Sequence, residues 1–234
     1  MIGVVGAPEL SFAVESAAPL KFATAPTLVF RLRVECGASA EVVAVALDVR
    51  LGVALRRRSY SPEARARLAE LLGAPGSEGG TPHSLFWAQT SLTVPRFMGR
   101  TAVDLPIGCS YDLEMALVRY LDALDEGEVP LEFLFSGSVF YHGAGGALQV
   151  ARLPWDREAQ YRLPIAIWRA ALEQHYPDSA WLRVRRDTLD RLNAYRARRL
   201  LPGWEAVFEE LLQLAAGGAA EPGKEVSNRW SRSQ

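Results

Sequence analysis

The sequence predicts an α+β fold in which an antiparallel β-sandwich is followed by a helical C-terminal segment. The first observation is a change of hydrophobic period: apolar residues recur at every second position from about residue 28 to 153, and at every third or fourth from about 164 to 214. A period of two places alternate side chains on one face of a strand, whereas a period of 3.6 forms a stripe on a helix. The second observation is that turn signals separate about eight strand-like runs, which is typical of a two-sheet sandwich; a closed barrel is the alternative.

Alternation identifies the individual strands. In the clearest run, from Leu28 to Cys36, every second residue is apolar, while Arg31 and Arg33 fall on the opposite face. One polar face of this kind favours an antiparallel sheet with one side in water. The same alternation predicts strands over Leu10–Val14, Val43–Val53, Leu85–Val94, Thr101–Ile107, Tyr111–Leu117, Pro130–Tyr141 and Ala147–Leu153. The expected core consists of the in-facing members of the most regular strands: Phe30, Leu32, Val45, Leu47, Val49, Leu131, Phe133 and Phe135.

The helices are predicted from caps and stripes. Ser61 is a suitable N-cap and Pro62 a suitable first residue for a short helix over residues 61–72. Near the C-terminus, stripes begin at Ile165, Leu189 and Trp204 and end before a proline or a glycine. We therefore predict an immunoglobulin-like sandwich body over residues 1–157, a helical segment packed on it over 158–216, and a disordered tail over 217–234.

Composition restricts the classes of function. The formal net charge of −1 gives no general attraction to nucleic acid or to anionic membranes, so we expect neither as a partner. No apolar stretch is long enough for membrane insertion, and the first residues lack the basic region of a signal peptide, so we expect a cytoplasmic location. A homo-oligomer is compatible with this composition.

No residues form a recognisable catalytic or metal-binding motif. Cys36 and Cys109 each end an alternating apolar run, so we expect buried free thiols, and no cofactor or metal is predicted. Ser136 and Ser138 lie inside a predicted strand rather than on a nucleophile turn, and Asp112 and Glu114 share what we interpret as a solvated strand face. The histidines, His83, His142 and His175, are far apart in the sequence. We assign no catalytic residue and do not expect an enzyme.

A cluster of arginine and aromatic residues is the best candidate for a binding site. Seven arginines between residues 183 and 199 face only two aspartates, so this stretch has a local net charge of +5. Arginine and tryptophan dominate protein–protein hot spots, so we predict a partner-binding surface formed by Trp168, Trp181, Arg183, Arg185 and Arg186. The alternative is that these arginines are internal and pair with the acidic run at 112–128.

Four segments carry a resemblance to a known family: Ala25–Arg33, Val129–Tyr141, Tyr161–Trp168 and Ser179–Thr188. They resemble a bacterial family catalogued only as a domain of unknown function, and the likeness spans roughly residues 9–212. Members of that family tend to be encoded beside high-affinity nickel–iron uptake hydrogenases, so the resemblance implies an accessory role there. It supplies no catalytic residues, and this chain lacks the cysteine pairs that would ligate nickel–iron or an iron–sulfur cluster.

The sequence thus favours a non-enzymatic protein-binding or scaffolding accessory protein with a protein partner, and the resemblance implies a partner related to a hydrogenase. The second hypothesis is an enzyme or small-ligand carrier with a site between the sandwich and the helices. A dry pocket with convergent polar groups would favour the second hypothesis, and an exposed arginine–aromatic patch would favour the first.

Overall fold

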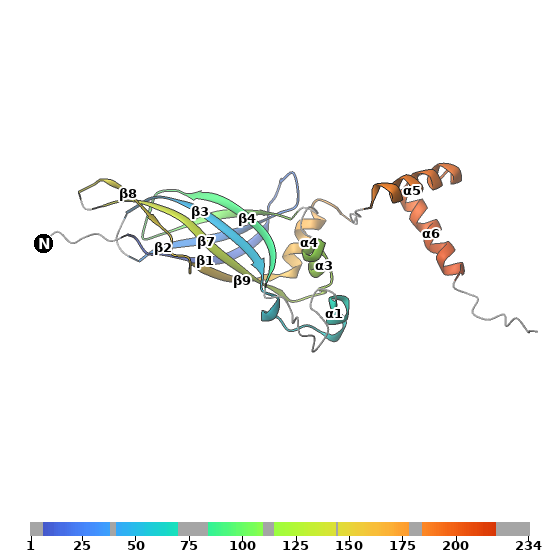
Figure 1. The fold of residues 1–234 in the computed structure, drawn as a ribbon, viewed down its shortest axis with the longest axis horizontal. Helices are drawn as coiled ribbons and strands as arrows, with labels where there is room; N and C mark the ends of the chain where they lie inside the picture. The colour runs from blue at the N-terminus through green and yellow to red at the C-terminus, as the bar shows by residue number, and fades with distance from the viewer. Residues whose placement is uncertain are drawn as a thin grey trace, which may run out of the picture. The chain divides into compact units, whose positions relative to one another are not determined.

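The computed structural model describes residues 7–37, 41–69, 84–109, 115–143, 145–177 and 184–218. The chain divides into two compact units, Met1–Ala180 and Trp181–Gln234 (Figure 1).

The first unit contains two antiparallel sheets. In the smaller sheet, β2 (Thr27–Cys36) lies between β1 (Leu10–Pro19) and β6 (Arg100–Gly108). The larger sheet has the order β4 (Leu85–Val94), β3 (Glu41–Val53), β7 (Glu128–His142) and β8 (Leu148–Arg152). The short strand β5 (Phe97–Met98) also pairs with β3, and β9 (Glu158–Pro164) pairs with the first half of β7. This mostly antiparallel arrangement with a few helices is an α+β fold consistent with a sandwich.

Aromatic side chains join the two sheets. Phe12 of β1 stacks on Phe135 of β7 with ring centroids 4.3 Å apart, and Phe30 of β2 meets Phe133 of β7 edge to face at 5.2 Å. These contacts place the core between the sheets. The predicted core is confirmed, because every one of its eight members is at most 2% exposed: Phe30, Leu32, Val45, Leu47, Val49, Leu131, Phe133 and Phe135.

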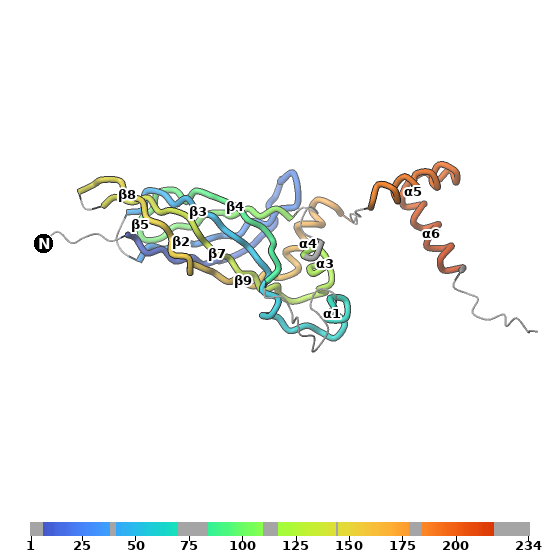
Figure 2. The backbone as a smooth tube through the Cα atoms, in the orientation of Figure 1, coloured from blue at the N-terminus to red at the C-terminus, as the bar shows by residue number. Residues whose placement is uncertain are grey.

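Short helices lie at one end of the two sheets, and the backbone view shows α3 (Met115–Asp122) and α4 (Ile165–Glu173) together there (Figure 2). Buried residues at helical spacing line this part of the chain: Leu117, Tyr120, Leu121 and Leu124. Helix α1 (Pro62–Arg67) follows the 3-10 turn η1 (Leu55–Arg57). The Ser61 side chain accepts a hydrogen bond from the Ala64 N–H at 3.1 Å, which confirms the predicted N-cap.

Three arginines fix the loop between α3 and β7. Arg58 donates to the carbonyl oxygens of Glu126 and Glu128 at 2.7 and 2.6 Å. Arg169 of α4 donates to the carbonyl oxygens of Leu124 and Asp125, and Arg67 of α1 forms an ion pair with the Asp125 carboxylate. Arg58 directly follows η1, and the other two arginines belong to α1 and α4, so these bonds tie the helical end of the unit together.

Two predicted elements need correction. The strand expected over Tyr111–Leu117 is wrong from Met115 onward, where helix α3 begins; residues 111–114, including Asp112 and Glu114, lie outside the described residues. The segment predicted to be helical over residues 158–216 opens with a strand, because residues 158–164 form β9, whereas its first helix begins at Ile165, where the predicted stripe begins. The apolar residues of β9 alternate, but two of its in-facing positions are the small Ala159 and the half-buried Tyr161, so its sequence signal is weak.

The second unit contains α5 (Arg186–Arg199) and α6 (Trp204–Gly218). Leu200 ends α5 in the left-handed conformation, with φ of 56°, and the N–H of Leu201 donates back to the carbonyl of Arg196 at 3.1 Å. This is the hydrogen-bond pattern with which many helices end, although glycine is the usual residue at such a position. The predicted tail begins within α6, and residues 219–234 lie outside the described residues.

Candidate protein-binding surface

The five predicted site residues are divided between the two units, and two of them lie outside the described residues. Trp168 belongs to α4 in the first unit, whereas Arg186 is the first residue of α5 in the second and Arg185 directly precedes it. Trp181 and Arg183 lie outside the described residues. The predicted surface is therefore reduced to exposed arginines at the start of α5.

Trp168 is a core residue, which corrects its place in the predicted surface. Its side chain is only 2% exposed and packs edge to face on Trp87 of β4, with ring centroids 5.7 Å apart. Ile165 and Ala171 of the same helix are also buried, so the apolar stripe of α4 faces the core of the first unit. A buried indole offers no contact area to a partner.

Helix α5 is basic and exposed. It contains five arginines and two aspartates, which gives it a net charge of +3, and none of its residues is buried. Arg185, which precedes it, retains 85% of its side-chain exposure and pairs with Asp187 at 3.2 Å. A surface ion pair of this kind contributes little to stability, so the guanidinium stays available to a partner.

The contacts between α5 and α6 join the C-terminal half of α5 to the first half of α6. The guanidinium of Arg196 lies over the Trp204 ring, 4.7 Å from its centroid, and Arg199 forms an ion pair with Glu210. This hydrogen-bonded guanidinium lowers the pKa of the Glu210 carboxyl. The pKa of the Tyr195 hydroxyl is raised by desolvation and by its hydrogen bond to Glu210.

Helix α6 leaves the apolar residues of its C-terminal part exposed. Val207 is fully buried, but Leu212 is 70% exposed and Leu214 is 59% exposed. On α5, Leu189 is 38% exposed. Isolated exposed leucines are ordinary, whereas several on one small helical unit make it a candidate binding surface.

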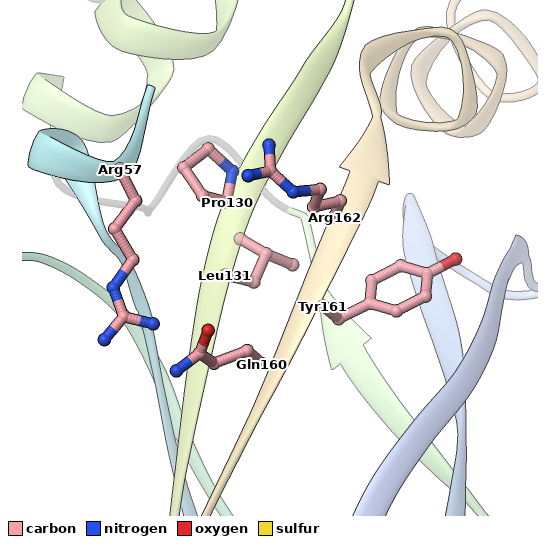
Figure 3. Close-up of a pocket in the computed structure, with 6 residues that line it drawn as sticks. All are labelled: Arg57, Pro130, Leu131, Gln160, Tyr161 and Arg162. Atoms are coloured by element: carbon pink, nitrogen blue, oxygen red, sulfur yellow. The ribbon is translucent and has the colours of Figure 1, made fainter. Parts of the chain in front are cut away.

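A shallow hollow of about 220 Å³ lies on the outer face of the larger sheet (Figure 3). Arg57 borders one side and Arg162 and Gln160 the other, with Pro130 between them, while Tyr161 points away. The hollow is open to solvent. Glu128 and Glu132 lie on the same face of β7 as Pro130, one on either side of it. The residues that line the hollow do not combine a nucleophile with a general base and a group that orients the base, as a catalytic site would.

The buried polar groups of the first unit are explained by packing. The hydroxyls of Tyr60 and Tyr120 lie 3.2 Å apart, and Tyr60 donates to the Leu55 carbonyl at 2.8 Å, so Tyr120 is the donor within the pair. Burial raises the pKa of both hydroxyls. Cys36 and Cys109 are buried free thiols, as expected, and burial raises the pKa of Cys109 to about 12, so this thiol is a poor nucleophile.

The histidines of the described residues make contacts to backbone carbonyls. His142 Nδ1 lies 3.0 Å from the Gly146 oxygen, and His175 Nε2 lies 3.0 Å from the Ala23 oxygen, which links the turn after α4 to the β1–β2 loop. His83 lies outside the described residues. Within the described ranges, no three histidine, cysteine or acidic side chains are grouped as metal ligands.

Sequence reasoning missed two exposed aromatic residues. Phe22, in the β1–β2 loop, is fully exposed and has a left-handed backbone with φ of 61°. Trp155, in the loop between β8 and β9, is 93% exposed. A large apolar side chain in water and a strained backbone are both unfavourable, and both features tend to occur at functional sites. Neither residue belongs to a periodic run, so no pattern in the sequence identified it.

A family model described as "Family of unknown function (DUF6084)" matches residues 7–220. The chain belongs to this family. Among curated proteins, no match was found. Two solved structures with partial similarity are a β-glucosidase from Kluyveromyces marxianus (8% identity, TM-score 0.23) and β-glucosidase 3B from Thermotoga neapolitana with bound α-D-glucose (10% identity, TM-score 0.24).

Each of these alignments covers 66% of this chain but only 15% and 17% of the respective β-glucosidase. The chain therefore matches a small part of each of those enzymes, and TM-scores this low support no conclusion about this protein. Within the described part of the DUF6084 chain, no helix is long and apolar enough to cross a membrane.

Proposed function

We propose that this DUF6084 protein is a non-enzymatic protein-binding or scaffolding accessory protein, and that α5 and α6 form its docking element. The observation that carries the proposal is the uncovered apolar surface of this unit, on which Leu212 and Leu214 are 70% and 59% exposed while Val207 is buried. Exposed apolar area beside basic side chains is typical of surfaces that bind proteins.

A unit of two helices has little means to stabilise itself. Chains this short bury a small fraction of their surface, and isolated helices of about 15 residues are marginal in water. A helix with apolar residues around much of its circumference is usually buried against other elements. The α5–α6 unit therefore gains stability when its leucines are covered by a protein surface.

The finer parts of the proposal rest on the sequence. The resemblance carried by the Ala25–Arg33, Val129–Tyr141, Tyr161–Trp168 and Ser179–Thr188 segments supports a partner from an uptake hydrogenase system. The alternating strands and the turn signals between them support an immunoglobulin-like sandwich. The two free thiols, Cys36 and Cys109, support a reducing compartment such as the cytoplasm.

Capture of the partner tests this proposal. The full chain carries an affinity tag in its native host, and the captured proteins are identified by mass spectrometry for the wild type and for an Arg185→Glu/Arg186→Glu variant. The expected result is capture of a hydrogenase subunit or maturation protein by the wild type and its loss in the variant, with the thermal unfolding of the variant unchanged.

An Arg152→Glu/Arg162→Glu variant is the matched control, since it reverses the same number of exposed charges on the sheet surface. The control should capture the partner as the wild type does. A wild-type chain that captures no protein specifically, or equal loss in both variants, contradicts the proposed function. Loss of stability in the Arg185→Glu/Arg186→Glu variant would instead show that these arginines are internal.

A further inference from the structure

The apolar stripe of α6 is covered at one end only. Val207, Leu211 and Leu214 follow one another at spacings of four and three residues, so they share one face of the helix. Val207 has no exposed area, Leu211 is half-buried, and Leu214 is 59% exposed. Because the contacts with α5 involve the first half of α6, the second half of the stripe needs another helix against it.

The charges of this unit are segregated between its two helices. Helix α5 carries a net charge of +3, whereas α6 has three glutamates and no basic residue, for a net charge of −3. Arg199 and Glu210 already pair with each other. Within the described residues, Arg191 and Arg198 of α5 and Glu205 and Glu209 of α6 are exposed and have no ion-pair partner.

We propose that the missing partner of α6 is α5 of a second copy of this chain, so that two α5–α6 units associate about a two-fold axis. This inference rests on the proposed function, because it names what covers the docking element. A strongly acidic partner would match α5 and repel α6, and a strongly basic partner would do the reverse. A second copy complements the charges of both helices, because a two-fold axis sets α6 of each copy against α5 of the other.

The dimensions of the helices suit this pairing. Helix α5 has 14 residues and α6 has 15, so the two are nearly equal in length and can lie side by side over their whole extent. Four helices of equal length form a bundle that buries an apolar stripe which two helices leave open. The dimer buries Leu214 and sets Glu205 and Glu209 of each copy beside the arginines of the other.

Two complementary charge-reversal variants of the full chain test the dimer. The first variant, Glu205→Arg/Glu209→Arg, has two basic helices, and the second variant, Arg191→Glu/Arg198→Glu, has two acidic helices. Each variant alone should repel its own copies, whereas their mixture sets an acidic helix against a basic one at both contacts. Sedimentation equilibrium measures the masses, and circular dichroism checks that each variant keeps its helices.

The wild type should sediment at about twice its chain mass of 25.7 kDa. Each variant alone should show a dimer dissociation constant raised by at least about 100-fold, and the equimolar mixture should restore association to within about 10-fold of the wild type. A Leu214→Asn variant, which removes apolar area without changing charge, should also weaken the dimer.

Two results overturn the inference: a wild-type chain that stays monomeric at high micromolar concentration, or a mixture that associates no better than its components. A monomer whose α6 amides are protected from hydrogen exchange would show that the first unit covers the helix instead. If the wild type is monomeric but still captures a partner from its host, only the dimer is rejected. If it neither associates nor captures a partner, the proposed function fails as well.

Discussion

The indole rings of Trp87 and Trp168 meet edge to face, with centroids 5.7 Å apart, and join strand β4 to helix α4. Both residues are at most 3% exposed, and neither indole N–H finds a hydrogen-bond partner among the described residues. The pair therefore contributes through buried apolar area and ring packing rather than through hydrogen bonding. It fixes α4 as part of the first unit.

Replacement of Trp168 distinguishes a core residue from a binding residue. Trp168→Ala should lower the free energy of unfolding by about 3–5 kcal/mol, because it leaves a cavity against Trp87. Trp168→Phe should lower it by less, since it keeps an aromatic ring and removes a buried N–H without a partner. Chemical denaturation measures both values. Wild-type stability of Trp168→Ala would return this residue to the predicted surface.

The fold was largely predictable because apolar and polar residues alternate along a strand wherever one face of the sheet is buried and the other is exposed to solvent. The alternation rule gave the wrong element at residues 115–117, where a short apolar run fits both the strand period of two and the helix period of 3.6. There the helix is favoured because Leu117, Tyr120, Leu121 and Leu124 can all be buried on one side, a set that extends beyond the run that suggested a strand. A short window of sequence contains too few positions to separate the two periods.

Phe133 should be central to the stability of the sandwich. It has no exposed area and contacts Phe30 across the core, so Phe133→Ala should lower the free energy of unfolding by about 3–5 kcal/mol. Leu134→Ala is the matched control, because Leu134 is the next residue on the outer face and is 42% exposed. Denaturant titration should show a much smaller loss for this control; equal losses would mean that the faces of β7 are misassigned.

Gly137 should not tolerate a side chain. Its φ is +137°, and a Cβ atom there would lie 2.0 Å from the Ala46 carbonyl oxygen of the paired strand β3. Gly137→Ala should therefore cost about 3 kcal/mol or more, from backbone strain together with displacement of β3. Gly146→Ala is the control, since Gly146 also has positive φ but faces open space, and it should cost only about 1 kcal/mol. Thermal unfolding that ranks the two variants the other way contradicts the β3–β7 register.

Cys109 should make the protein less stable at alkaline pH. Burial raises the pKa of its thiol to about 12, whereas a thiol in an unfolded chain ionises near pH 8.5, at about 1.4 kcal/mol per pH unit of difference. Above pH 8.5 the unfolded state binds fewer protons than the folded state, so this contribution to stability is lost progressively as the pH rises toward 12. A Cys109→Ala variant should lose stability less steeply between about pH 9 and 11. Equal slopes for variant and wild type would show that the thiol is not buried.

The candidate site was less predictable than the fold, for a physical reason. A stripe at helical spacing shows that one face of a helix is covered, but it does not identify the element that covers it. The stripe of α4, with Trp168, is covered by the first unit, whereas the stripe that ends at Leu214 of α6 is left open. Local charge density likewise identified the arginines near Arg185 but not their partners, because those depend on tertiary contacts.

The most direct test of the docking account is the behaviour of a chain that ends at Pro177 and so lacks α5 and α6. If these helices serve to bind proteins, the shortened chain should keep the sandwich, unfold within about 2 °C of the full chain, sediment as a monomer and capture no partner. A clearly lower unfolding temperature would contradict the account, since it would show that α5 and α6 complete the core of the first unit.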